Sequence, residues 1–219
     1  RNKKEMAEAS AVGTTDNAST NSIPPDFSIT NGSTSPNKAA AIALAFIVLF
    51  HMTRSWYQGS LTTFLPLWIE LQGNGTIGAA TILFFLVGSI PVGSIVGGTL
   101  SDRLGRWQVI LTATVLMVPT HSILLIPLIA ENPTTILILT SLLGFLIGTT
   151  YPVAIVMAQD TWPKNIGVAS GLVMGVGGIP GGIGPSILGI IADEMGLRQA
   201  LSTLTIPLLI GIVAVVCYR

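Results

Sequence analysis

The stretch that decides the fold reads GTLSDRLGR, residues 98–106, and it lies between two long runs without charged residues. Residues 71–101, which end inside this stretch, form an uncharged run of 31 residues, and residues 107–130 form another of 24. A helix of about 20 apolar residues spans the hydrocarbon core of a bilayer. The two runs therefore predict two membrane-spanning helices joined by a short polar loop.

The same pattern continues along the chain. Residues 132–159, 165–192 and 199–218 are further uncharged runs, of 28, 28 and 20 residues. With the apolar segment that follows Lys38, they predict an all-α membrane protein with a six-transmembrane-helix bundle. The expected helices are residues 39–70, 76–100, 107–130, 134–158, 165–192 and 198–218.

The composition excludes an ordinary soluble chain. Half of the residues are hydrophobic, 9% are charged and the mean hydropathy is +0.73, whereas a soluble domain carries roughly 25% charged residues. Lys+Arg and Asp+Glu are equal at 10 each, so no basic excess favours nucleic acid as a partner.

Residues for enzyme or metal chemistry are scarce. The single cysteine, Cys217, excludes an internal disulfide, and His51 and His121 have no cysteine or carboxylate cluster near them in sequence. The chain also lacks GxSxG, P-loop and dinucleotide-binding motifs. We expect no metal, no cofactor and no enzymatic activity.

Residues 1–38 differ from the rest of the chain. They hold 8 of the 20 charged residues, lack Leu, Trp and Tyr, and are rich in Ser, Thr, Asn and Pro. Such a segment cannot bury enough apolar surface to offset the entropy of ordering it. We expect a disordered cytoplasmic loop or tail here and a transmembrane domain at residues 39–219. Because the first residue is Arg1 rather than Met, we also expect a fragment of a longer chain.

The basic residues predict the orientation. If residues 1–38 are cytoplasmic and the helices alternate, the cytoplasmic segments hold eight basic residues and the outer segments hold only Arg198. This asymmetry follows the positive-inside rule. It predicts an integral membrane protein of the cytoplasmic (inner) membrane, with residues 1–38 and the 101–106 loop on the cytoplasmic side.

The residue types in this loop each suggest a physical role. Gly98 allows close helix packing, Gly105 permits a tight turn, and Asp102 places a carboxylate at the membrane boundary. Arg103 and Arg106 anchor the loop on the cytoplasmic side. The plain alternative is a positive-inside hairpin that happens to contain Asp and Gly.

This stretch resembles the cytoplasmic loop motif G-x-L-x-D-R-x-G-R of the major facilitator superfamily. The matching residues are Gly98, Leu100, Asp102, Arg103, Gly105 and Arg106. Trp107 departs from the family pattern, which usually has a further basic residue there. The resemblance implies a twelve-helix fold in two halves, with this chain as the C-terminal half, an absent N-terminal half as its partner, and the loop as a conformational latch between alternating-access states.

Two further segments resemble fosmidomycin-resistance-type exporters of this superfamily. They are RSWYQGSLTTFLP, residues 54–66, and GGIPGGIGP, residues 177–185. The resemblance implies proton-coupled efflux of a small organic solute, anionic or drug-like as fosmidomycin is. Uptake by a porter of the same superfamily, or a six-helix scaffold that transports nothing, are the alternatives.

Arg54 is a charge in the middle of a predicted helix, sixteen residues from both Lys38 and Glu70. An arginine facing lipid at that depth costs at least ~2.5 kcal/mol, so it must face protein or water. With His51, Gln58 and Thr62 it forms one polar stripe. The stripe lines a solute cavity if Arg54 binds an anionic group. Alternatively, Arg54 bonds to backbone carbonyls or to a carboxylate of the absent half.

Other predictions concern coupling and helix motion. Histidine changes charge near neutral pH, so His51 is a candidate proton carrier, although a packing role is common for a lone histidine. Tyr151 is a candidate cavity residue. Small residues and prolines in residues 165–192 predict a packing or hinge segment at the interface between the two halves. The hinge candidates are Gly177, Pro180, Gly181, Gly184 and Pro185.

Overall fold

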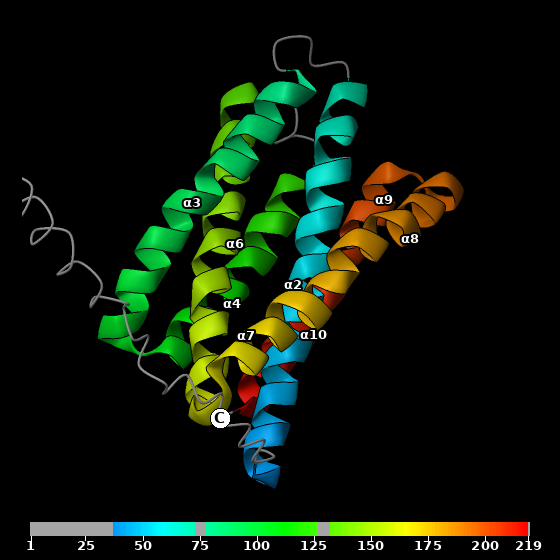
Figure 1. The fold of residues 1–219 in the computed structure, drawn as a ribbon. Coiled ribbons are helices and arrows are strands. Elements are labelled where there is room, and N and C mark those ends of the chain that lie inside the picture. Colours follow the sequence, from blue (N-terminus) through cyan, green and yellow to red (C-terminus); the bar gives the residue numbers. More distant parts are fainter. Residues whose placement is uncertain (1–36, 73–77, 127–131, 219) are drawn as a thin grey trace, which may run out of the picture. The chain divides into compact units, whose positions relative to one another are not determined.

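The computed structural model describes residues 37–72, 78–126 and 132–218. The expected disordered segment at residues 1–38 lies outside the described residues, apart from Asn37 and Lys38. The described part holds six helical spans that are long and apolar enough to cross a membrane, which confirms the six-helix bundle (Figure 1).

Four spans are single helices. They are α2 (Lys38–Leu71), α3 (Ala79–Leu104), α4 (Arg106–Leu124) and α6 (Pro133–Thr161). The fifth span comprises η1 (Pro163–Asn165), α7 (Ile166–Gly175), η2 (Val176–Gly178) and α8 (Ile179–Met195). The sixth comprises α9 (Leu197–Thr203) and α10 (Thr205–Tyr218).

The predicted loop at residues 98–106 is mostly helix, which corrects the sequence prediction. Helix α3 continues through Asp102 and Arg103 to Leu104, and α4 begins at Arg106. The turn between them is Gly105 alone, with φ of 96° in the left-handed region that glycine adopts without strain. One such residue reverses the chain, so the motif presents its side chains from two helix ends.

Other helix boundaries also differ from the sequence prediction. Helix α4 ends at Leu124 rather than near residue 130, and residues 127–131 lie outside the described part. Helix α6 begins at Pro133, where the side chain of Asn132 accepts hydrogen bonds from the backbone N–H groups of Thr134 and Thr135. Asn132 therefore caps the start of α6, since it satisfies N–H groups that have no partner in the first turn.

The fifth span is broken just before Pro180. Residues Val176–Gly178 form one turn of 3₁₀ helix, in which the N–H of Ile179 donates to the carbonyl of Val176. That carbonyl is the one whose α-helical donor would be Pro180, which has no N–H. Pro185, the other predicted kink, lies inside α8. The sixth span is also broken, at Leu204, three residues before Pro207.

Helices α3 and α6 are held together by facing glycines. A methyl group placed on Gly93 or on Gly148 would overlap a backbone carbonyl oxygen of the other helix, that of Phe145 or of Ile90. Gly97 and Gly144 meet the partner helix in the same way. In a bilayer such small residues let two backbones approach closely, and α3 and α6 therefore form a tightly paired unit.

Candidate functional site

The structure brings three of the predicted site residues together. The rings of His51 and Tyr151 lie 5.5 Å apart between their centres, and Arg54 Cζ lies 5.0 Å from the centre of the Tyr151 ring. His51 and Arg54 come from adjacent turns of α2, and Tyr151 comes from α6. We call these residues the His51–Arg54–Tyr151 cluster.

Arg54 is directed at α6 and is only 5% exposed. Its Nε donates a hydrogen bond of 2.8 Å to Thr150 Oγ1, and its Nη2 donates one of 2.9 Å to the carbonyl of Ile147. The charge faces protein, as its cost in lipid requires. The backbone contact is one of the two alternatives that the sequence left open. Direct solute binding by Arg54 stays a prediction.

Gln58 and Thr62 continue along α2 beyond the cluster. Both are half-buried, and the Thr62 hydroxyl donates to the carbonyls of Gln58 and Gly59 in its own helix. The polar stripe therefore divides into a part that contacts α6 and a part bonded within α2. A solute role for Gln58 and Thr62 also stays a prediction.

Pro152 leaves a carbonyl of α6 without its usual partner, and another helix supplies one. Proline has no N–H for the carbonyl of the residue four positions earlier, which is Gly148. The hydroxyl of Ser94, on α3, lies 3.1 Å from that oxygen and 3.1 Å from the carbonyl of Ile90 in its own helix, so it shares its proton between the two acceptors. Sequence reasoning missed Ser94. Its signal was its position directly after Gly93, on the helix face that pairs with α6.

A second buried network joins three helices away from the cluster. His121 Nε2 lies 3.0 Å from the carbonyl of Leu201, and Tyr57 Oη lies 3.1 Å from His121 Nδ1. A carbonyl only accepts, so Nε2 carries the proton and Nδ1 accepts from the tyrosine hydroxyl. Tyr57 and His121 are fully buried. The network connects α2, α4 and α9 at the level of the break in the sixth span.

The predicted hinge glycines face α2 within this bundle. A methyl group on Gly177 would come within 2.8 Å of the His51 ring, and one on Gly184 within 3.0 Å of Trp56. A methyl group on Gly181 would come within 3.2 Å of a carbonyl of α2. This stripe therefore packs against α2 within the bundle, and a hinge role or an interface with the other half stays a prediction for these glycines. Pro180 is buried and Pro185 is half-buried in the same span.

A different set of glycines on the fifth span has open space beside it. A methyl group on any of them would meet nothing within 4 Å; they are Gly167, Gly171, Gly175, Gly178 and Gly182. They recur at helical spacing on another face of the span. The glycines that the sequence treated as one population therefore divide into a packed stripe and an open stripe.

His51 is held by ring contacts rather than by hydrogen bonds. It is 2% exposed, and its Nδ1 is buried without a hydrogen-bond partner among the described residues. Its neighbours are Tyr151 and Gly177, one on α6 and one in the 3₁₀ turn of the fifth span. The imidazole therefore lies between α6 and the 3₁₀ turn, at the point where α2 contacts the break in the fifth span.

The motif at residues 98–106 presents one paired and two exposed charges. Arg106, the first residue of α4, forms an ion pair with Asp160 near the end of α6. Asp102 and Arg103 are exposed at the end of α3 and form no ion pair within the described part of the chain. Trp107, which replaces the usual basic residue, donates from Nε1 to the carbonyl of Val215 on α10, at 2.8 Å.

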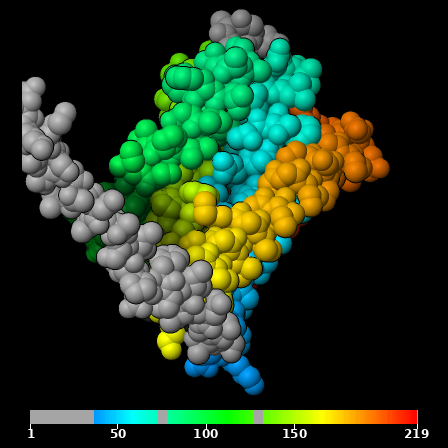
Figure 2. All heavy atoms as spheres, viewed as in Figure 1, coloured from blue at the N-terminus to red at the C-terminus, as the bar shows by residue number. Residues whose placement is uncertain are grey.

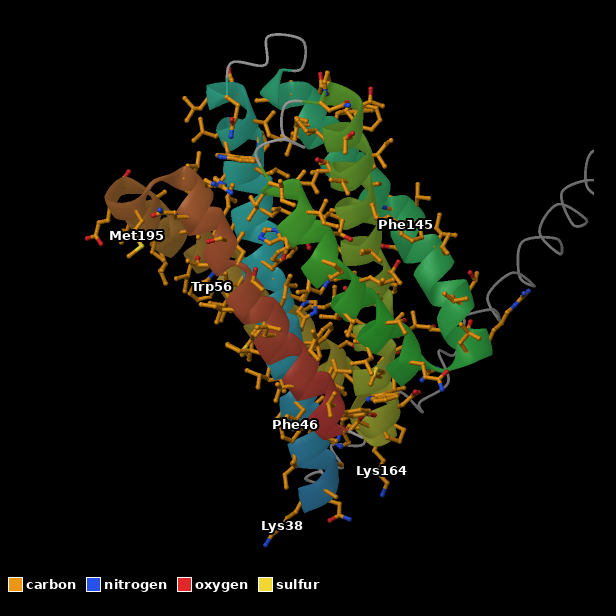
Figure 3. All side chains as sticks on the ribbon, turned by 180° about the vertical axis from the view of Figure 1, so that it is seen from behind. Lys38, Phe46, Trp56, Phe145, Lys164 and Met195 are labelled. Atoms are coloured by element: carbon orange, nitrogen blue, oxygen red, sulfur yellow. The ribbon has the colours of Figure 1, made fainter. Side chains whose placement is uncertain are left out.

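The same end of the bundle carries further basic residues. Figure 3 shows Lys38 and Lys164 extending from that end, at the start of α2 and in the link after α6. The alternation of spans also places Arg103 and Arg106 there. In the described residues, no group of three His, Cys, Asp or Glu side chains could hold a metal ion.

Six apolar spans around buried polar contacts define an integral, multi-pass helical membrane protein. The sequence matches the profile of the Major Facilitator Superfamily over residues 37–219, and the chain belongs to that family. It is 26% identical over 164 residues to the fosmidomycin resistance protein of Escherichia coli (strain K12), covering 74% of this chain and 39% of that protein.

A second relative is an uncharacterized MFS-type transporter, YfnC, of Bacillus subtilis (strain 168). It is 33% identical over 132 residues, which are 60% of this chain and 31% of that protein. The chain thus spans well under half the length of each of these curated relatives.

Proposed function

We propose that this chain is the C-terminal six-helix half of a secondary active transporter, which exports a small organic solute by alternating access. The family assignment and the name of the Escherichia coli relative support transport and export. The observation that carries the proposal is the His51–Arg54–Tyr151 cluster, which puts a cation against an aromatic ring deep within the membrane span.

The cluster suits an anionic or drug-like solute. Tyr151 is half-buried and offers a ring and a hydroxyl, while Arg54 beneath it supplies positive charge in surroundings of low dielectric constant. Arg54 thus acts in two ways: it holds α6 through Thr150 and Ile147, and it attracts an anionic solute. Gln58 and Thr62, further along α2, extend the proposed contact surface for the solute.

The surface around α6 offers a place for the solute. Figure 2 shows a face of the bundle that is hollowed between α3 and the fifth span, with part of α6 lying deeper than both. We propose that this hollow is closed on its other side by the absent N-terminal half. The open glycines Gly171, Gly175, Gly178 and Gly182 would allow helices of that half to approach the fifth span closely.

We further propose that the end carrying Lys38 and Lys164 faces the cytoplasm, as the positive-inside rule favours, and that the membrane is the cytoplasmic one. Asp102 and Arg103 then act as the latch, since they are the exposed charges of the motif. The proton gradient drives export. His51 is the proposed proton carrier, because it contacts both the cluster and the break in the fifth span.

The experiment is a resistance and accumulation assay with the gene that encodes this chain, in cells lacking their own exporter. Expression should lower the accumulation of fosmidomycin or a related phosphonate, and Tyr151→Ala should abolish that effect. Tyr218→Phe, at the far end of α10, is the matched control and should export normally. Raised accumulation would favour uptake, and an unchanged level with a panel of anionic drugs would favour the scaffold.

A further inference from the structure

Two crevices meet along one face of α2. The outer crevice has a volume of about 420 Å³ and lies between α2, α7 and the link that follows α6. The inner crevice has a volume of about 330 Å³ and lies between α2, the start of α8 and α10. Leu49 and Met52 line both crevices, so the two form one continuous groove, which we call the α2 groove.

The walls of the α2 groove are apolar. Ala41, Ala45 and Val48 line the outer crevice from α2, and no charged residue lines either crevice in the part of the chain that the structure describes. The inner crevice includes the hydroxyl of Thr53, which donates a 2.8 Å hydrogen bond to the carbonyl of Phe50 in its own helix. The groove therefore suits a hydrocarbon chain and offers little to a polar ligand.

The outer crevice has the length of one membrane leaflet. The lining of this crevice along α2 runs from Ala41 to Met52, over which a helix rises about 16 Å. One leaflet contributes about half of the hydrocarbon core, or about 15 Å. Trp162, which is half-buried, lines the end of the crevice near Ala41, and tryptophan is enriched where a membrane meets water.

Two lysines lie close to this end of the groove. Lys38 precedes Ala41 by three residues, which places the two on neighbouring positions of the helix surface, and Lys164 follows Trp162 by two residues. Both lysines are exposed, and neither forms an ion pair within the described residues. Figure 3 shows both side chains extending from the same end of the bundle. Lysines at a membrane surface attract anionic lipid headgroups.

We propose that the α2 groove is a binding site for one anionic phospholipid of the adjoining leaflet. The phosphate of its headgroup lies between Lys38 and Lys164, and one acyl chain fills the outer crevice and ends in the inner crevice. Within a bilayer the hydrophobic effect gives no preference for one apolar surface over another. The preference therefore comes from the charge of the headgroup and from the fit of the chain.

The position of the groove favours lipid over the absent half as its occupant. Ile206 and Ile210, which line the inner crevice from α10, are 58% and 44% exposed. Helix α10 lies on the face seen in Figure 3, which is the reverse of the hollowed face in Figure 2. None of the open glycines of the fifth span lines the groove. The proposal needs only a membrane location, so it can fail while the proposed export holds, and the reverse.

The test is the quenching of tryptophan fluorescence by brominated lipids in vesicles that contain the full-length protein. Bromine in the upper part of an acyl chain quenches a tryptophan that the chain contacts. One variant keeps only Trp162, and another keeps only Trp68, which is 4% exposed and serves as the baseline. We expect brominated phosphatidylglycerol to quench Trp162 several-fold more than brominated phosphatidylcholine at the same mole fraction, and neither lipid to quench Trp68.

The lysines supply the control for the headgroup. Lys38→Gln combined with Lys164→Gln should abolish the preference for phosphatidylglycerol, whereas arginine at both positions should retain it. Arg103→Gln removes another exposed positive charge at the same end, from α3, and should leave the preference unchanged. An equal loss in the Arg103→Gln variant would mean that the charge of the whole surface attracts the lipid, and it would overturn the proposed site.

A bulky residue in the groove supplies the control for the acyl chain. Ala45→Phe fills part of the outer crevice and should lower the quenching of Trp162, whereas Ala80→Phe, at an exposed alanine of α3, should not. Equal quenching of Trp162 by the two lipids in the unmodified groove would overturn the proposal, because no headgroup would be selected. Absence of quenching by either lipid would also overturn it, because protein would then cover the groove.

Discussion

Ser94 donates a hydrogen bond of 3.1 Å to the carbonyl of Gly148, the oxygen that Pro152 leaves without a helical donor. The bond joins α3 to α6 at the point where their glycines bring the two backbones together. Arg54 bonds to the neighbouring carbonyl, that of Ile147. The carbonyls of α6 just before Pro152 are thus bonded from α3 and α2, as backbone groups without a helical partner require in lipid.

We expect Ser94→Ala to destabilise the bundle by about 0.6 kcal/mol, and by no more than about 1.7, the range measured for such bonds in membranes. Adding Pro152→Ala should recover the loss, since an alanine N–H then bonds to Gly148. Unfolding in mixed detergent micelles measures both. Ser122→Ala, whose hydroxyl bonds within α4, is the control. If Ser94→Ala lowers the free energy of unfolding equally with and without Pro152→Ala, this account is refuted.

The glycine contact between α3 and α6 predicts a sharp contrast within one helix. Gly93→Ala places a methyl group on the carbonyl of Phe145, and such overpacking costs typically about 1–3 kcal/mol. Gly88→Ala, also on α3, meets nothing within 4 Å and should be neutral or slightly stabilising. Thermal unfolding followed by size-exclusion chromatography distinguishes them. Equal stability of the two variants would show that the helices are not in close contact.

Tyr57 and His121 should be energetically coupled. Tyr57→Phe and His121→Ala each remove one side of a fully buried hydrogen bond. We expect a double-mutant cycle in detergent to give a coupling energy of about 0.6–1.7 kcal/mol. Strict additivity of the two changes would mean that the bond does not form.

Arg54→Lys should abolish export while the protein still reaches the membrane. Lysine keeps the charge but lacks the planar fork that bonds to Thr150 and Ile147 together. Drug accumulation measures export, and surface labelling measures insertion. Unchanged resistance in cells carrying Arg54→Ala would end both proposed roles of this residue. Arg198→Lys, at the other end of the bundle, is the matched control and should export normally.

His51→Gln should flatten the pH profile of export if His51 carries the coupled proton. A glutamine retains polarity and approximate size but does not titrate between about pH 5 and 8. Uptake of labelled solute into inverted vesicles, measured across that range, gives the profile. His121→Gln is the control, because His121 belongs to the Tyr57 network rather than to the cluster. A profile identical to that of the unmodified protein would remove His51 as the carrier.

The sequence predicted the positions of the membrane spans more accurately than the breaks within them. Each uncharged run is long enough to cross a bilayer, and in lipid a helix satisfies its backbone hydrogen bonds internally, so residue type and run length suffice. The break at Leu204 was not predicted, and the break near Pro180 falls at Val176–Gly178. The break at Val176–Gly178 follows from Pro180, which has no N–H for the carbonyl of Val176, whereas the packing of His51 against Gly177 at that turn is visible only in the tertiary structure.

By itself, the sequence determined that this chain lies in a membrane, that it crosses it six times, and that Arg54 must face away from lipid. Those conclusions follow from the free energy of transferring apolar and charged groups, which depends on composition and depth alone. Only the tertiary structure decided which groups Arg54 contacts and which glycines pack against another helix. It also decided that Ser94 bonds to the carbonyl of Gly148 in α6. Those facts depend on contacts between residues about 50 to 100 positions apart, such as Arg54 with Thr150, and helical periodicity carries no information about them.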